Sequence, residues 1–133
     1  MIYKKSKILF IGTVEFSYRA LSILIKNKFD IVGLLTKSES NFNSDYYDLT
    51  PLAKANNIPI FYRTKDNQDE IISFINSKNP DIIYCFGWSH ILPKNILSIP
   101  KHGVIGFHPA ELPNNRGRHP IIWALFLGLK QTA

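Results

Sequence analysis

Five short apolar runs, each followed by a segment of helical character, constrain the fold of this chain more than any other feature. The apolar runs occupy 7–13, 29–37, 58–62, 80–87 and 102–108, and the helical segments occupy 15–27, 48–57, 66–79, 92–100 and 120–130. The connections are too long for hairpins, so the alternation is typical of parallel strands joined by crossover helices. The pattern therefore predicts an α/β fold, a doubly wound and mostly parallel sheet flanked by helices.

Length and composition indicate one folded unit without disulfides. The chain has 133 residues, of which 45% are hydrophobic, which suffices for one core and predicts a single domain over 1–133. The one cysteine, Cys85, provides neither a disulfide nor a metal cluster, and the apolar run near the start is too short for a secretion signal or a membrane span. We therefore expect a cytoplasmic protein with no metal and no membrane partner.

The formal net charge of +6 suits anionic ligands, but the lysines are mostly scattered singly along the chain. Ordinary solvated surface explains such scattered charge better than a nucleic-acid site does. The polar loop after the second apolar run also sets Glu39 and Asp45 against Lys37, which disfavours contact with a phosphate backbone. Nucleic acid is therefore not the expected partner.

The stretch 104–126, VIGFHPAELPNNRGRHPIIWALF, contains the strongest candidate for a catalytic residue. In a doubly wound sheet, ligands bind beyond the carboxyl ends of the strands, and His108 stands at the end of the fifth run. We expect that run to be a fully buried strand, and Pro109 restricts the backbone of His108 to extended geometry. An imidazole held in this way can donate a hydrogen bond or relay a proton near neutral pH. The alternative is a purely structural histidine.

Two further groups of side chains are candidates for ligand binding. Arg116 and Arg118 flank a glycine before the last helix, and their guanidinium groups suit carboxylate or phosphate oxygens, although a solvated loop paired with Glu111 is equally compatible. The segment 86–93, FGWSHILP, brings two large rings and two aliphatic side chains to the end of a strand. Such apolar walls suit a planar heterocycle, unless the rings pack beneath the helices instead.

The turn after the first strand gives a weaker signal. A nicotinamide or flavin site needs three glycines at fixed spacing, and the segment IGTVEFS has only Gly12. Gly12 and Thr13 nevertheless leave open backbone at the start of a helix, which can accept a phosphate or a sugar hydroxyl. The remaining histidines, His90, His102 and His119, lack metal-ligand spacing. His102 is interpreted as a turn residue and His119 as the lead into the last helix, whereas His90, in a loop at the end of a strand, is compatible with a structural or a functional role.

Three segments, in this order along the chain, resemble the N-terminal domain of the folate-dependent formyltransferases. They are ILFIGTVEFSYRAL, FGWSHILPKNIL and GVIGFHPAELPNNRGRHPIIWALFLG, of which the last is the most specific. The resemblance covers nearly the whole chain and implies a Rossmann-like sheet. Within the family, the segments 36–61 and 106–125 look most like the sugar-nucleotide N-formyltransferases. This likeness implies a cytoplasmic transferase that acts on a nucleotide-linked amino sugar, in the synthesis of lipopolysaccharide or another surface polysaccharide.

The resemblance also implies residue roles. The family transfers a formyl group from N10-formyltetrahydrofolate to an amine, and His108 would donate a hydrogen bond to the formyl oxygen. Gly106 occupies the position of a family asparagine that contacts the same oxygen. The folate would lie along Phe86, Gly87, Trp88, Ile91 and Leu92. The acceptor would be held by Thr13, Asn43, Ser44, Asp45, Arg116 and Arg118.

Two departures from the family pattern bear on activity. Gly106 supplies no side-chain amide, and the family's catalytic aspartate lies further downstream than the residues after His108, so the domain is expected to be C-terminally incomplete. Both departures predict impaired transfer. One alternative is a non-catalytic domain that binds folate or nucleotide and associates with itself through unpaired sheet edges. The other is a fragment of a methionyl-tRNA formyltransferase.

Overall fold

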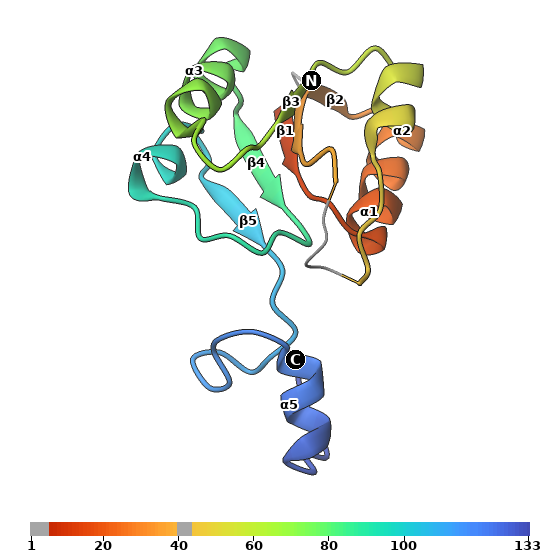
Figure 1. Cartoon of the computed structure of the whole chain (residues 1–133), viewed down its shortest axis with the longest axis vertical. Coiled ribbons are helices and arrows are strands. Elements are labelled where there is room, and N and C mark those ends of the chain that lie inside the picture. Colours follow the sequence, from red (N-terminus) through yellow and green to blue (C-terminus); the bar gives the residue numbers. More distant parts are fainter. Residues whose placement is uncertain (1–5, 40–43) are drawn as a thin grey trace, which may run out of the picture.

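The computed structural model describes residues 6–39 and 44–133, and it contains every strand and helix expected from the sequence (Figure 1). The strands are β1 (Lys7–Ile11), β2 (Asp30–Thr36), β3 (Ile60–Tyr62), β4 (Ile82–Cys85) and β5 (Val104–Gly106). The helices are α1 (Glu15–Lys26), α2 (Thr50–Ala55), α3 (Gln68–Lys78), α4 (Lys94–Leu97) and α5 (Pro120–Phe126). The last two helices are shorter than the apolar pattern predicts.

All five strands pair in parallel, in the order β3-β2-β1-β4-β5. β1 is central, and its Phe10 lies opposite Leu34 of β2 and Tyr84 of β4. The chain builds outward from β1 to β3, then crosses back to β4 on the other side. The strand order thus reverses between β1 and β4, where doubly wound sheets bind their ligands. The predicted sheet is confirmed.

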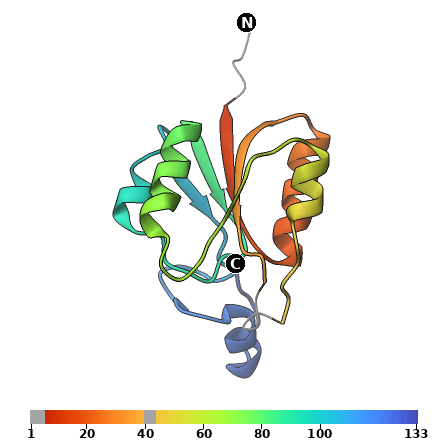
Figure 2. The same ribbon diagram turned by 45° about the horizontal axis from the view of Figure 1, so that its top comes forward.

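Neighbouring residues of the strands supply two separate cores, because their side chains point to opposite faces of the sheet. Leu9 of β1 packs in one cluster with Ile75 of α3 and Ile96 of α4. Phe10 faces the other way and packs with Leu21 of α1 and with residues of α2. Figure 2 shows α1 and α2 on one side of the sheet and α3 and α4 on the other. Two covered faces explain why the inner strands are apolar without alternation.

The last strand differs from its expected state. The outer edge of β5 pairs with no strand in the part of the chain that the structure describes. Ile105 is 46% exposed, and Gly106 is exposed as well. The residues of β5 are as apolar as those of an inner strand. β5 lies at the edge of the sheet because of the strand order, and the strand order cannot be read from the local pattern of apolar residues. The expectation of a fully buried strand before His108 is therefore wrong.

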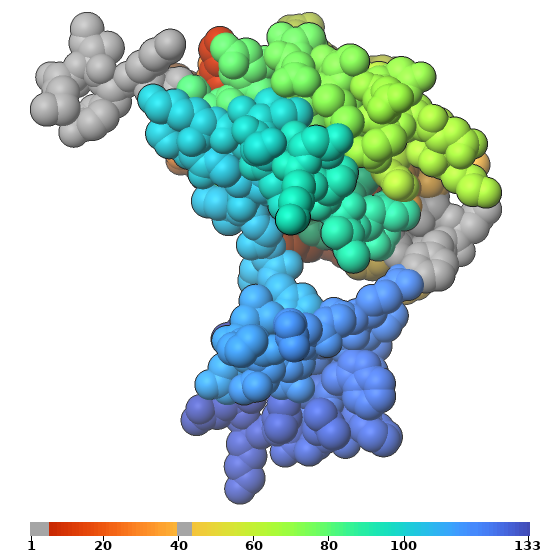
Figure 3. All heavy atoms as spheres, turned by 90° about the vertical axis from the view of Figure 1, so that its left-hand side faces the viewer, coloured from red at the N-terminus to blue at the C-terminus, as the bar shows by residue number. Residues whose placement is uncertain are grey.

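Beyond β5 the chain leaves the sheet and forms a lobe of residues 107–133. Figure 1 shows α5 beyond the carboxyl ends of the strands, and Figure 3 shows the lobe joined to the rest by a narrow neck. α5 buries only Ala124. The lobe contacts the sheet layer through the rings of Phe16 and Phe107, whose centroids lie 4.9 Å apart. Among the described helices, none is both long and apolar enough to cross a membrane.

Candidate functional site

Ser17 connects the ends of β1 and β4, where the strand order reverses. Its hydroxyl oxygen accepts hydrogen bonds from the amides of Thr13 and Val14, both at 3.2 Å, and the hydroxyl donates to the carbonyl of Phe86 at 2.5 Å. Gly87 makes room for this arrangement, since a Cβ there would collide with Val14 and Ser17, and its φ of +68° favours glycine. The two turns therefore form one fixed wall at the carboxyl edge of the sheet.

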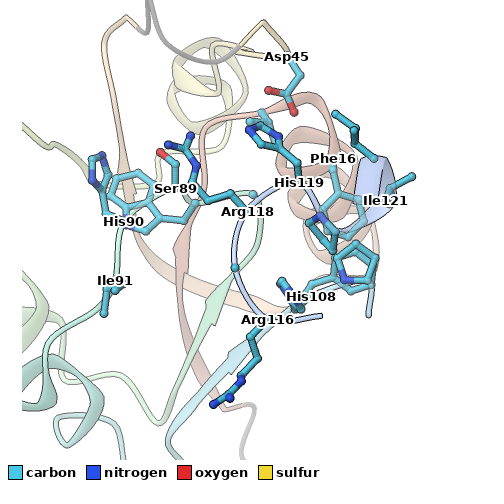
Figure 4. A pocket seen from close by; sticks show the side chains of 18 of the residues that line it. Phe16, Asp45, Ser89, His90, Ile91, His108, Arg116, Arg118, His119 and Ile121 are labelled. Atoms are coloured by element: carbon cyan, nitrogen blue, oxygen red, sulfur yellow. The ribbon is translucent and has the colours of Figure 1, made fainter. Parts of the chain in front are cut away.

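A hollow of about 990 Å³ opens beyond this wall, between the sheet and the 107–133 lobe. Its lining comes from both parts of the molecule and comprises Val14, Phe16, Asp45, Leu112 and the stretches 87–91, 107–109 and 116–122. Figure 4 shows Asp45 and His119 on one side of this space and Arg116 on the other. Apolar walls with a few polar groups are typical of a small-molecule site.

His108 lies on the lobe side of the hollow and is partly buried. Its Nε2 lies 3.1 Å from the backbone carbonyl of Asn115. A carbonyl oxygen can only accept, so Nε2 carries the proton and donates it to this bond. Asn115 has a φ of +54°, a left-handed conformation that asparagine tolerates better than most residues. The loop after Pro113 therefore holds the imidazole in one tautomer and provides a donor at the hollow.

Several cationic side chains converge near His90, opposite His108. The His90 ring stands edge-on to Trp88 with the centroids 5.6 Å apart, and the Lys37 ammonium lies 5.8 Å from the Trp88 centroid. Burial lowers the pKa of His90, and the positive charges of Arg63, Lys37 and Arg118 lower it further. The Nε2 atom of His90 is buried without a hydrogen-bond partner among the described residues. This side of the hollow is electropositive and suits an anionic group.

The hollow brings together seven of the residues that the sequence singled out as site candidates. They are Asp45, Gly87, Trp88, Ile91, His108, Arg116 and Arg118. Phe86 and Leu92 do not line it. The Phe86 ring packs against the α1 side of the sheet, stacked on Tyr84 at 5.5 Å, and Leu92 adjoins the core cluster on the α3 side. The alternative of rings packed beneath the helices thus applies to Phe86.

The other candidates lie elsewhere. Thr13 is fully buried with its amide bonded to Ser17, and the amide of Gly12 donates to the carbonyl of Leu35 at 3.2 Å. The backbone expected to be open to a phosphate is therefore already satisfied inside the fold. Ser44 and Gly106 are exposed but do not line the hollow. Asn43 lies outside the described residues.

Sequence reasoning did not select most of the other residues that line the hollow, among them two histidines and an aromatic ring. The role of His90 was left open, His119 was interpreted as the lead into the last helix, and Phe107 was not selected, yet all three line this space. The signal that could have found them was their position near the ends of strands. His90 follows β4, where the strand order reverses, and Phe107 and His119 flank the loop that contains His108. Within the described ranges, no three His, Cys, Asp or Glu side chains gather closely enough to hold a metal ion.

Comparison with known sequences identifies relatives over nearly the whole chain. The family model described as "Formyl transferase" matches residues 6–133. The chain is 36% identical over 130 residues to the methionyl-tRNA formyltransferase of Alkaliphilus oremlandii, and 37% identical over 131 residues to that of Clostridium acetobutylicum. Each alignment covers 95% of this chain and 42% of the relative, so the chain spans about two fifths of their length. These relatives do not support the expected likeness to sugar-nucleotide enzymes.

Solved structures show the same fold at lower identity. Glycinamide ribonucleotide transformylase 1 from Geobacillus kaustophilus aligns with a TM-score of 0.75 at 18% identity, covering 95% of this chain and 70% of that one. A formyltetrahydrofolate deformylase from Pseudomonas syringae aligns with a TM-score of 0.74 at 19% identity, covering 96% of this chain and 43% of that one. With its sheet, its family match and its relatives in agreement, the chain belongs to the formyl transferase family.

Proposed function

We propose that the hollow binds a formyl-carrying tetrahydrofolate and that the chain supplies the formyl-donor site of a methionyl-tRNA formyltransferase. The observation that carries this proposal is the placement of His108 and Trp88 on one hollow at the strand-order reversal. The family match and the named relatives supply the reaction class and the acceptor. Trp88 and Ile91 offer an apolar wall for the pterin ring, as the sequence predicted.

The proposed chemistry is an acyl transfer between two nitrogens. The amine of the acceptor attacks the formyl carbon, so a new C–N bond forms while the bond from that carbon to N10 of the folate breaks. The amine gives up a proton and N10 gains one. His108 assists by donating a hydrogen bond from Nε2–H, without losing the proton, to the oxygen on which negative charge develops. To do so, it exchanges the Asn115 carbonyl for the formyl oxygen as its acceptor.

The convergence of cations supports an anionic partner at this site. Lys37, Arg63 and Arg118 are far apart in sequence, yet all three influence the pKa of His90. Folate carries carboxylates and tRNA carries phosphates, and either is attracted to such a cluster. The scattered lysines, interpreted from sequence as evidence against nucleic acid, are thus a poor guide here. A nucleotide-linked amino sugar has no comparable support, and we do not favour it as the acceptor.

Calorimetric titration with a stable 10-formylfolate analogue tests the proposal. The chain has two tryptophans, of which Trp88 lines the hollow and Trp123 does not. We expect the Trp88→Ala variant to lose most of the binding heat and the Trp123→Ala variant to retain it, with circular dichroism confirming that both are folded. Equal binding by the two variants, or no binding by the parent chain, would contradict the proposed folate site.

A second candidate, folate binding without turnover, is favoured by Gly106. A Cβ at this position would meet only the carbonyl of Cys85, at 3.8 Å, so a larger side chain fits here. The Gly106→Asn variant therefore restores the amide of the family pattern without distorting β5. If the missing amide limits transfer, formylation of methionyl-tRNA rises in Gly106→Asn and falls again when His108→Ala is added. If neither the parent nor Gly106→Asn shows a measurable rate while both bind the 10-formylfolate analogue, the site is one for binding alone.

A further inference from the structure

The hydroxyl of Ser17 is used completely within the fold. Ser17 is 0% exposed and lies in the first turn of α1. A serine hydroxyl has one donor and two acceptor sites, and here the amides of Thr13 and Val14 occupy the acceptor sites while the Phe86 carbonyl accepts the proton. No site is left for a ligand. The hydroxyl can therefore act on the hollow only through the backbone that it holds.

The bond to Phe86 continues the pairing of two strands beyond their ends. In the part of the chain that the structure describes, the last backbone bond between the β1 and β4 segments runs from the Phe86 amide to the Ile11 carbonyl, at 2.9 Å. The carbonyl of Phe86 is then held by Ser17 instead of by a strand. Because a peptide unit is planar, a carbonyl that is held also fixes the direction of the following amide and Cα, which belong to Gly87.

Two glycines let the backbone approach this hydroxyl closely. A Cβ on Gly12 would lie 2.5 Å from both the hydroxyl oxygen of Ser17 and the carbonyl oxygen of Phe86. A Cβ on Gly87 would lie 2.5 Å from the same hydroxyl oxygen. Only glycine leaves room for such contacts. The segments 12–14 and 86–87 are therefore packed around one oxygen atom.

Trp88 directly follows the peptide that this oxygen holds, and it lines the hollow. Its ring is half-buried, packs against the core on the α3 side, and otherwise contacts the side chains of His90 and Lys37. These contacts influence which way the ring lies. Where the ring starts is determined by the backbone, and that backbone is held by Ser17.

We propose that Ser17 is a positioning residue for the hollow. Its hydroxyl orients the peptide between Phe86 and Gly87 and thereby places Trp88 against the bound ligand. The inference rests on the proposed folate site, because it assigns the ring of the formyl donor to the Trp88 wall. A binding wall has to be held to within about 0.5 Å to be effective, so losing the hydroxyl weakens binding although it touches no ligand atom.

Calorimetric titration with a stable 10-formylfolate analogue, combined with the fluorescence of Trp88, tests this inference. All variants are made in Trp123→Phe, in which Trp88 is the only tryptophan. We expect Ser17→Ala to weaken binding of the analogue by about tenfold and to shift the emission maximum of Trp88 in the ligand-free protein. Ser17→Cys fills the same site with a weaker donor, so its affinity should lie in between, and it replaces Ser17→Ala in the test if the latter does not fold.

Two controls separate positioning from a general loss of stability. Ser22→Ala removes another hydroxyl of α1, but this one donates to the Tyr18 carbonyl of its own helix at 2.7 Å, so affinity and emission should not change. Ile8→Ala removes a side chain that is 2% exposed at the amino end of β1, at the opposite edge of the sheet. This variant should melt at a lower temperature, yet bind the analogue as the parent does when both are folded.

Three results would overturn the inference. The first is a folded Ser17→Ala that binds the analogue as tightly as Ser22→Ala. The second is weaker binding without any change in the emission of Trp88, and the third is an equal loss of affinity in Ile8→Ala. If the parent itself does not bind the analogue, the folate site is contradicted. Emission of Trp88 that is unchanged in ligand-free Ser17→Ala would then contradict the positioning role as well.

Discussion

The sheet and the 107–133 lobe are built from equally apolar sequence but bury it to opposite degrees. Leu9 and Ile83 in the sheet are 0% exposed, whereas Leu125 and Phe126 on α5 are 76% and 78% exposed. The inner strands are covered on both faces, whereas no layer of the described residues packs over α5. The difference teaches that apolar side chains favour burial, but that they are buried only where another element of the structure packs over them. The candidate site lies at the junction of these two regions.

The largest expected effect on stability comes from replacing one leucine in each region by alanine. Leu9→Ala leaves a cavity in the closed core and should lower the free energy of unfolding by about 2–5 kcal/mol. Leu125→Ala removes a side chain from solvent and should change it by no more than about 0.5 kcal/mol. Urea denaturation of both variants, compared with the parent, gives the two values. Losses of similar size would show that α5 is packed as firmly as the sheet.

Two glycines at the ends of adjacent strands offer a sharper contrast. Gly87→Ala forces a Cβ into Val14 and Ser17 at a φ of +68°, so we expect a loss of about 1–3 kcal/mol in unfolding free energy. Gly106→Ala meets only the carbonyl of Cys85 and should be nearly neutral. Thermal unfolding followed by circular dichroism compares the two. If Gly106→Ala proved the more damaging substitution, the edge position of β5 would be contradicted.

Packing against the core also changes the pKa of the Cys85 thiol. Burial raises the pKa of the Cys85 thiol to about 12, above the value of about 8.5 for an exposed thiol. The unfolded chain therefore loses this proton first, so the contribution is intact below about pH 8.5 and is lost as the pH rises toward 12. We expect the stability of the parent to fall more steeply than that of Cys85→Ala between about pH 8 and 10. If the unfolding free energies of the two proteins, measured in urea, fell equally with pH, the raised pKa of this partly buried thiol would be contradicted.

The smallest effect concerns the electropositive wall. Burial and the neighbouring cations lower the pKa of His90, so its stabilising contribution is present above about pH 6.5 and is lost as the pH falls through the lowered value. Arg63→Gln removes one of these charges and should raise the pKa of His90. Arg19→Gln should not, because Arg19 is in an ion pair with Glu15 on α1 and is not among the charges that act on His90. NMR titration of the imidazole protons measures both. If the pKa of His90 were identical in the parent and in both variants, the claim that neighbouring cations lower it would be contradicted.

Much of the fold could be predicted from sequence because the inner strands are covered on both faces. A run such as residues 7–11 must then be apolar throughout, and the long connections leave only parallel pairing. The burial of β5 could not be predicted, because its residues repeat the same local pattern at the edge of the sheet. Whether β5 is buried depends on whether another strand pairs with its outer edge, and the strand order that decides this is a property of the whole fold.

The candidate site was predictable only in part, for a related reason. His108 and Trp88 could be found because each lies within three residues of the carboxyl end of a strand. The cluster of Lys37, Arg63 and Arg118 could not be seen, since three loops far apart in sequence must fold together to create it. Phe86 continues the alternation of β4 and lies on the same face as Tyr84, whereas the left-handed backbone of Gly87 breaks that alternation and lets Trp88 line the hollow.

Hydrogen–deuterium exchange of the chain, with and without a stable 10-formylfolate analogue, tests the central claim most directly. The claim is that a rigid sheet and a loosely attached lobe form one folate site between them. We predict slow exchange in β1 and β4 under both conditions, fast exchange in 107–122 without the analogue, and marked protection of 87–91 and 107–122 when the analogue is bound. Protection confined to other segments, or exchange unchanged by the analogue, would contradict the claim.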